Sequence, residues 1–142
     1  MRSAALGRSM PKTIRQTVTI PAPPHAVYEA LLDSREHSAF TGAAAKISRR
    51  VGGTFSVFDG WAHGKIVSLE KDARIVETWR TEDFANDAPD STVSFTIRPH
   101  RGGSRLTFVH SGVPDGEYTD LKQGWIDYYW KPLQKYFQAR RP

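Results

Sequence analysis

The longest helical pattern in the chain is LKQGWIDYYWKPLQKYF, residues 121–137. Its large apolar side chains recur every three or four residues, which is the period of one face of an α-helix. The residues on that face are Leu121, Trp125, Tyr128, Tyr129, Pro132, Leu133, Tyr136 and Phe137. The pattern predicts a helix of about twenty residues, capped at Thr119 or Asp120. A kink is expected at Pro132, because a proline ring removes one backbone hydrogen bond and crowds the preceding turn.

Upstream of this helix, short strand patterns dominate. TIRQTVTI (13–20) alternates apolar and polar residues, as a strand with one buried face does. Further strand-like runs follow at AKISRRV (45–51), TFSVFDG (54–60), HGKIVSLEK (63–71), RIVETWRT (74–81), TVSFTIRP (92–99) and SRLTFVHSG (104–112). Glycine and aspartate in the connections between them are typical of tight turns, so the runs predict an antiparallel meander.

Two short helices are expected between the first and second strand patterns. The prolines of PAPP (21–24) are tolerated in the first turn of a helix, which should run to about Leu32. Asp33 or Ser34 can cap a second helix over residues 35–40, which Gly42 ends. The order of strand, two helices, six strands and long helix predicts an α+β fold, in which one seven-stranded antiparallel sheet has its helices on one face.

Length and composition narrow the class of protein. A chain of 142 residues with 39% hydrophobic and 25% charged residues is typical of one soluble globular domain. The net charge of +5 comes from scattered basic residues, so no nucleic-acid surface is predicted. No stretch approaches the roughly 18 consecutive apolar residues of a membrane span. Residues 1–12 lack the apolar core of a signal peptide; we expect a disordered tail there, with Met10 as an alternative start, and a cytoplasmic location.

Catalytic and metal-binding motifs are absent from the sequence. The chain has no cysteine, which excludes thiol catalysis, iron–sulfur ligation and disulfides. It has no nucleophile elbow, phosphate-binding loop or His-Glu-x-x-His motif. His63 and His110 with Asp59 could supply two imidazoles and one carboxylate to a metal, but no spacing motif supports that set. No metal, cofactor or catalytic residue is therefore predicted.

Four segments carry a resemblance to a known family: IPAPPHAVYEALLD (20–33), GGTFSVFDGWAHGKIVSLEKDARIVETWR (52–80), TVSFTIRPHRGGSRLTFVHSG (92–112) and GWIDYYWKPLQKY (124–136). They resemble the SRPBCC superfamily, the helix-grip fold of birch-pollen-allergen-like, START and polyketide-cyclase proteins. More narrowly, they are similar to the heat-shock-protein-90 ATPase activator family in its short, single-domain bacterial form. The resemblance implies a helix-grip domain over residues 13–138, with the sheet wrapped around the C-terminal helix.

The resemblance also implies a cavity between the sheet and the long helix. Strand alternation places Trp79 and Phe95 on the inner face of the sheet, together with the ionisable Asp59, Glu77 and His110. The helix should add Trp125, Tyr128 and Tyr129. The predicted ligand-binding residues are therefore Asp59, Glu77, Trp79, Phe95, His110, Trp125, Tyr128 and Tyr129. The alternative interpretation is that Asp59 and His110 contact water at strand ends, that Glu77 pairs with a basic residue, and that the aromatic residues only fill the core.

One segment departs from the family pattern. Relatives commonly carry an aromatic pair where this chain reads HSAFTGAAAK (37–46), in which Phe40 stands alone beside small residues. We expect Phe40 on the rim of the cavity, with a wider entrance beside it.

The sequence predicts binding of a hydrophobic or amphipathic small molecule in the cavity. Two alternatives are a domain that interacts with the heat-shock ATPase, as the family name suggests, and a cyclase or hydrolase using Glu77 or His110 as general acid–base. The partners considered are a small hydrophobic ligand, a chaperone and a second copy of the chain. A mass co-purifying with the protein would separate a filled pocket from a bare protein-binding surface.

Overall fold

The structure is a computed structural model that describes residues 10–140. Within that range the strands are β1 (Lys12–Ile20), β2 (Lys46–Ile47), β3 (Thr54–Val57), β4 (Ala62–Glu70), β5 (Arg74–Thr81), β6 (Ser91–His100) and β7 (Gly103–Val113). The helical segments are α2 (Pro24–Leu32), α3 (Ser34–Thr41), η1 (Asp115–Glu117), α4 (Tyr118–Trp125), η2 (Ile126–Trp130) and α5 (Lys131–Ala139). The predicted order of elements is confirmed. Most of the expected N-terminal tail, residues 1–9, lies outside the described residues, and β1 begins at Lys12.

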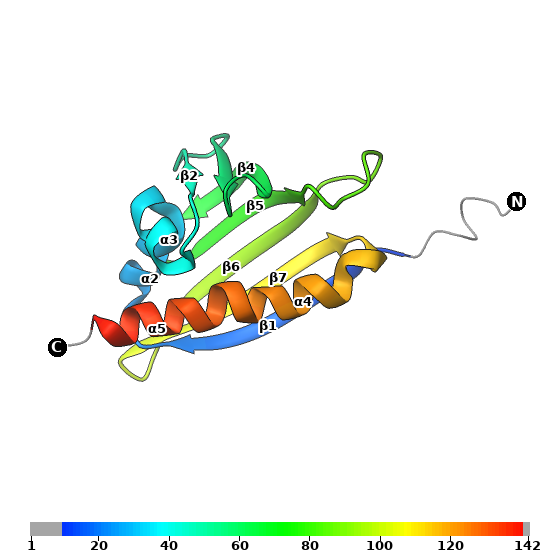
Figure 1. Cartoon of the computed structure of the whole chain (residues 1–142). Coiled ribbons are helices and arrows are strands. Elements are labelled where there is room, and N and C mark those ends of the chain that lie inside the picture. The colour runs from blue at the N-terminus through cyan, green and yellow to red at the C-terminus, as the bar shows by residue number, and fades with distance from the viewer. Residues whose placement is uncertain (1–9, 141–142) are drawn as a thin grey trace, which may run out of the picture.

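All strands belong to one antiparallel sheet in the order β1-β7-β6-β5-β4-β3-β2. The segment from η1 to α5 forms the long C-terminal helix, which runs across one face of this sheet in front of β1 and β7 (Figure 1). Helices α2 and α3 lie near the α5 end of that helix. The α+β helix-grip architecture is therefore confirmed, although the strand expected at 45–51 is reduced to the two residues of β2.

One aspartate organises the pair of short helices. Asp33 ends α2, donating its backbone N–H to the carbonyl of Glu29, and its carboxylate accepts the backbone N–H of Glu36 at 2.9 Å. It therefore caps α3, as one of the two residues expected to do so. Gly42 ends α3 with φ at +77°, a conformation that only glycine adopts without steric cost.

The C-terminal helix differs from expectation at its start and near its proline. It begins through the 3₁₀ turn η1, and Glu117 precedes α4 without a side-chain cap, so the cap expected at Thr119 or Asp120 is wrong. A kink was expected at Pro132, and the structure has a π-helical turn, η2, just before this residue, in which the backbone N–H of Lys131 donates to the carbonyl of Ile126. The helix continues through this turn into α5.

The π-helical turn changes which side chains face the sheet. Such a turn holds more residues than an α-helical turn, so side chains after Trp125 are displaced around the helix axis. Trp130, which was not on the predicted apolar face, is only 4% exposed, whereas Tyr128, which was, is 64% exposed. Trp130 stacks on Trp125 and donates its indole N–H to the Gln16 side chain at 2.6 Å.

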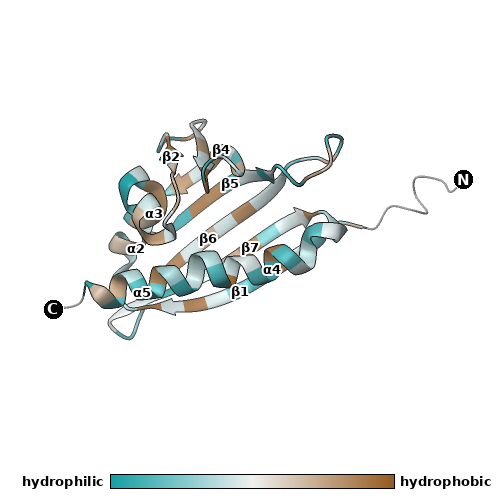
Figure 2. Ribbon diagram, in the orientation of Figure 1, coloured by the Kyte–Doolittle hydropathy of each residue, from teal (hydrophilic) through white to brown (hydrophobic). Residues whose placement is uncertain are grey.

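The core lies between the helix and the inner face of the sheet. Hydrophobic residues alternate along β5, β6 and β7 on the side that faces the helix (Figure 2). Phe108 on β7 is fully buried, and its ring centroid is 4.3 Å from that of Trp125. Phe95 and Trp130 pack against the same ring. This aromatic cluster joins the helix to the sheet.

Phe40 is part of the core and does not lie on the rim of the cavity between sheet and long helix, where it was expected. Its side chain is 6% exposed and contacts the rings of His37, Tyr129 and Tyr136. Because α3 packs against α5 and η2, Phe40 fills the space between the short helices and the C-terminal helix.

Replacing Phe108 with alanine should lower the free energy of unfolding by about 3–5 kcal/mol, because the cavity left in the aromatic cluster cannot fully collapse. Phe40→Ala should cost a comparable amount, since Phe40 is a core residue. Val51→Ala, at a position 61% exposed, is the control and should change stability by less than about 0.5 kcal/mol. Urea titrations measure all three. A Phe40→Ala protein that unfolds at the wild-type urea midpoint would show that this residue is not part of the core.

Candidate functional site

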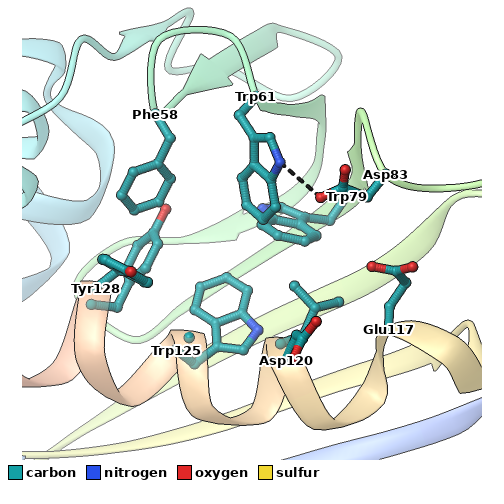
Figure 3. A pocket seen from close by; sticks show the side chains of 11 residues that line it. Phe58, Trp61, Trp79, Asp83, Glu117, Asp120, Trp125 and Tyr128 are labelled. Atoms are coloured by element: carbon teal, nitrogen blue, oxygen red, sulfur yellow. Dashed lines mark hydrogen bonds between the residues drawn. The ribbon is translucent and has the colours of Figure 1, made fainter.

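A pocket of about 430 Å³ opens at the α4 end of the interface between helix and sheet (Figure 3). Its lining comes from the turn between β3 and β4, from β5 and the loop after it, and from η1, α4 and η2. The lining residues are Phe58, Trp61, Trp79, Asp83, Glu117, Asp120, Leu121, Gly124, Trp125, Tyr128 and Tyr129. Most of them are aromatic, and we call this site the aromatic pocket.

A second hollow of about 470 Å³ lies between α3 and α5, beside Phe40 and Tyr136. Its rim includes the exposed Asp127, Lys131 and Lys135. None of the eight ligand-binding residues predicted from the sequence lines it, although Phe40, expected on the rim of a cavity, does. The aromatic pocket is therefore the better candidate for a functional site.

Edge-on and tilted ring contacts build the walls of the aromatic pocket. Trp61 and Trp79 meet at 5.9 Å between ring centroids with an interplanar angle of 78°, and Trp79 lies 5.1 Å from Trp125. On the other side, Phe58 contacts Tyr128 at 6.3 Å and Tyr129 at 5.4 Å. Such contacts add to the stabilisation from burial and restrict ring movement, so the walls are formed before any ligand arrives.

The turn between β3 and β4 brings Phe58 and Trp61 to the pocket. Phe58, Asp59 and Gly60 all have positive φ, at +53°, +59° and +93°. Two consecutive non-glycine residues in this region are uncommon, and they need support from the surroundings. Asp59 supplies it: its carboxylate accepts the N–H of Ala44 at 2.9 Å, and its own N–H donates to the carbonyl of Ala44.

A buried chain of hydrogen bonds holds Trp125 at the pocket. Ser91 donates its hydroxyl proton to the carbonyl of Trp79 at 2.6 Å, so the Ser91 oxygen is available to accept the Nε2 proton of His110 at 2.8 Å. His110 Nδ1 then accepts the indole N–H of Trp125 at 3.1 Å. This arrangement requires the neutral Nε2–H tautomer, and burial lowers the pKa of His110 to about 3, which agrees with it.

A second set of buried polar side chains, made up of His37, Glu77 and the hydroxyl of Tyr129, lies behind the pocket wall. Tyr129 lines the pocket with its ring, while its hydroxyl is 3.1 Å from Nε2 of the buried His37. Glu77 is buried close enough to Tyr129 to raise the pKa of its phenol, in addition to the larger effect of burial. Burial raises the pKa of Glu77 itself to about 8, and no hydrogen-bond or ion-pair partner for its carboxyl is found within residues 10–140.

Three carboxylates line one end of the aromatic pocket, which we call its mouth. Asp83 accepts the indole N–H of Trp61 at 3.1 Å, which ties the loop after β5 to the pocket wall. Glu117 and Asp120 stand at the beginning of the C-terminal helix. Burial raises the pKa of Glu117, and the neighbouring Asp83 and Asp120 raise it further. The mouth is therefore negative, in a chain whose net charge is +5.

The structure brings together half of the residues predicted from strand alternation and the helix face. Trp79, Trp125, Tyr128 and Tyr129 line the pocket. Glu77, His110 and Phe95 are buried behind it, in the inner face of the sheet. Asp59 lies outside it and is exposed, because β3 ends at Val57 and the positive-φ turn breaks the alternation on which its placement depended.

Sequence reasoning missed Phe58, Trp61 and the three carboxylates. The dipeptide Asp59-Gly60 is a turn signal, and it could have indicated that the aromatic residues on either side belong to a turn and not to a strand. Nothing in the linear sequence indicates that Asp83 would meet Glu117 and Asp120, because the long loop of residue 83 meets the helix only in the folded chain.

The remaining histidines do not form a metal site. No group of three His, Asp or Glu side chains within residues 10–140 is placed to hold a metal ion. His63 is exposed and His110 is buried, so the set of Asp59, His63 and His110 is not assembled.

Among the helices of residues 10–140, none has both the length and the apolar character needed to cross a membrane.

Comparison with known proteins identifies the relatives of this chain. The model of the family described as activator of Hsp90 ATPase homolog 1-like protein matches residues 21–138. An uncharacterized protein of Schizosaccharomyces pombe is 30% identical over 124 residues, covering 87% of this chain and 37% of that protein. The activator of 90 kDa heat shock protein ATPase homolog of Dictyostelium discoideum is 25% identical over 118 residues, covering 80% of this chain and 30% of that protein. The chain spans about a third of the length of these relatives.

A solved structure supports the fold. The crystal structure of an Hsp90 activator from Plasmodium falciparum superposes with a TM-score of 0.83 at 24% identity. The superposition covers 92% of this chain and 97% of the other. At this identity the likeness concerns the architecture, which the two chains share over nearly their whole length.

The buried ionisable groups predict how stability depends on pH. Folding raises the pKa of Glu77 from 4.5 to about 8, so the folded chain holds this proton more tightly, and stability falls as pH rises between those values. Folding lowers the pKa of His37 to about 4 and of His110 to about 3, from 6.5, so their effect is a gain in stability as pH rises, which is complete only about one pH unit above 6.5. Between pH 6.5 and 8.5 the loss from Glu77 is the larger effect.

The free energy of unfolding should therefore decrease by about 1 kcal/mol between pH 6.5 and 8.5, because a loss of about 2 kcal/mol from Glu77 is partly offset by a gain of about 1 kcal/mol from the two histidines. In Glu77→Gln the decrease should be absent and the small gain from the histidines should remain, because the amide does not titrate. Glu70→Gln, at an exposed position on β4, should keep it. Urea titrations at four pH values across this range measure the slope, and a wild-type stability that is constant across it would contradict a buried protonated Glu77.

Proposed function

The chain belongs to the activator of Hsp90 ATPase homolog 1-like family, and we propose that it binds a hydrophobic or amphipathic small molecule in its aromatic pocket. The observation that carries this proposal is the pocket itself. Its volume of about 430 Å³ falls in the range of roughly 300–1,000 Å³ that is typical of ligand pockets. Its lining is largely aromatic, with a few polar groups at the edge, and this is the usual composition of such pockets.

Hydrogen bonds within the protein already hold the walls of the pocket in place, so a ligand would not have to order these side chains. Trp125 is fixed by His110, Trp61 by Asp83, and Tyr129 by His37. Little side-chain entropy would then be lost on binding, which favours affinity in a small pocket.

The cyclase or hydrolase alternative receives less support. The two residues considered as general acid–base, Glu77 and His110, lie behind the pocket lining. Both ring nitrogens of His110 are already bonded, so this side chain has no nitrogen left to exchange a proton with a substrate.

A chaperone partner is the second candidate. The Dictyostelium relative is named as an activator of the 90 kDa heat shock protein ATPase, and a relative from Saccharomyces cerevisiae is named Hsp90 co-chaperone AHA1. A specific observation favours a protein partner: arginines are exposed on the face of the sheet that the helix does not cover. Arg98 on β6 is directly opposite Arg105 on β7, and Arg74 and Arg15 lie on the flanking strands.

Such a basic face suits an acidic surface of a partner protein. The chain spans only part of these relatives, so their activity as whole proteins belongs to this second proposal. Stimulation of the ATPase of purified Hsp90 that is lost in an Arg98→Ala, Arg105→Ala variant would favour it. A cytoplasmic location and a homodimer, both expected from the sequence, stay proposals as well.

The pocket proposal predicts the effect of one exposed lining residue. Tyr128→Ala removes an aromatic contact worth about 0.5–1.5 kcal/mol, so affinity for the uncharged fluorescent probe Nile red should fall roughly threefold to tenfold. Because Tyr128 is 64% exposed, the free energy of unfolding should stay near that of the wild type.

Val51→Ala is the matched control for this experiment. It also removes an exposed apolar side chain, but from the turn between β2 and β3, away from the pocket. Fluorescence titration should show wild-type affinity for this variant. Equal losses in both variants, or no saturable binding by the wild type, would contradict the proposed function.

A further inference from the structure

We propose that the ligand of the aromatic pocket is an organic cation with an apolar body, whose positive charge lies among Asp83, Glu117 and Asp120. The inference rests on the proposed function and specifies the class of ligand. It follows from how charge and aromatic rings are distributed around the pocket.

The pocket has two chemically different ends. Asp83 and Glu117 lie at one end with Asp120 next to them, whereas Phe58 and Tyr128 lie at the other, as Figure 3 shows. The tryptophan rings stand between the two ends. An apolar body and a charged group on one molecule would match this division.

All charged residues that line the pocket are acidic. Within residues 10–140, none of the three forms an ion pair. Two lysines near the start of the C-terminal helix are engaged elsewhere: Lys12 on β1 is 2.8 Å from Asp115, and Lys122 on α4 lies over the ring of Tyr118. The negative charge at the mouth is therefore left without a compensating cation from the described chain.

Helix stability explains only part of this arrangement. Carboxylates are favourable at the beginning of a helix, which accounts for Glu117 and Asp120. Asp83, however, is on the loop after β5, and it approaches the same mouth from the sheet. Burial raises the pKa of Glu117 and both aspartates raise it further, which shows that each of them repels the negative charge of Glu117. A bound cation would remove that repulsion.

The aromatic walls favour an organic cation over a metal ion. The faces of tryptophan rings attract alkylammonium groups, and the attraction increases when the site excludes water. Trp61, Trp79 and Trp125 offer such rings beside the carboxylates. No group of three acidic or histidine side chains in the described part of the chain could hold a metal ion, and a hydrated metal would gain little from ring faces. An anionic ligand would meet three like charges.

Three naphthalene ligands of the same shape and different charge test the inference on the wild-type protein. They are naphthylmethyl-trimethylammonium, its neutral analogue in which carbon replaces the nitrogen, and naphthylmethanesulfonate. Calorimetric titration at low salt should show the cation binding about tenfold more tightly than the neutral analogue, with the anion weakest. Added salt should reduce the preference, because Asp83 and Asp120 are exposed to screening.

A pair of variants locates the preference at the pocket mouth. Glu117→Gln with Asp120→Asn removes two of the carboxylates and keeps the bond between Trp61 and Asp83. In this double variant the cation and the neutral analogue should bind within about threefold of each other, and affinity for the neutral analogue should match the wild type. Glu70→Gln with Asp87→Asn changes the net charge equally at exposed positions outside the pocket lining, and it should retain the preference.

The outcomes separate this inference from the proposed function. If none of the three ligands binds the wild type, the proposed function fails, and the inference fails with it. Equal binding of the cation and the neutral analogue would overturn the inference and leave the proposed function standing. A preference that the control variant loses as fully as the pocket variant would also overturn it, because the overall charge of the protein would then be its cause.

Discussion

The hydrogen bond between the indole of Trp125 and Nδ1 of His110 connects the C-terminal helix to the centre of the sheet. Through Ser91 it continues to the backbone of Trp79, so β5, β6, β7 and α4 share one buried polar chain. Each group in this chain is the hydrogen-bond partner of the next. Loss of one partner would leave a buried polar group unpaired, which would lower the free energy of unfolding by about 1–3 kcal/mol. Two of its members, Trp79 and Trp125, also line the aromatic pocket, so the geometry of the pocket depends on this chain.

The protein around the aromatic pocket has two chemically different layers. His110, His37 and Glu77 are buried behind the aromatic rings, where burial keeps them neutral near pH 6–7. The charged groups that meet the pocket are carboxylates at its mouth. An apolar body would therefore contact rings, and its polar end would meet negative charge. The π-helical turn η2 contributes to this division, because it places Trp130 in the core and leaves Tyr128 exposed at the end of the pocket opposite the carboxylates.

Local patterns were sufficient to predict much of this architecture. The period of residues 121–137 indicated the helix, and the alternation in β5, β6 and β7 placed Trp79, Phe95 and His110 inside correctly. Predictions failed where the backbone leaves its regular geometry. The turn at Asp59 broke the strand alternation, and the π-helical turn displaced Tyr128. The acidic mouth was not predictable, because its members come from two segments that meet only through tertiary packing.

The account depends most on the aromatic pocket being the site at which a ligand binds. The chain contains four tryptophans, of which Trp61, Trp79 and Trp125 line the pocket, while Trp130 is bonded to Gln16 outside it. Their indole N–H signals in a ¹⁵N-correlated NMR spectrum report the site directly during titration with naphthylmethyl-trimethylammonium. The signals of Trp61, Trp79 and Trp125 should shift together and saturate, with Trp130 nearly unchanged. Saturable binding that leaves the three pocket signals in place would contradict the account.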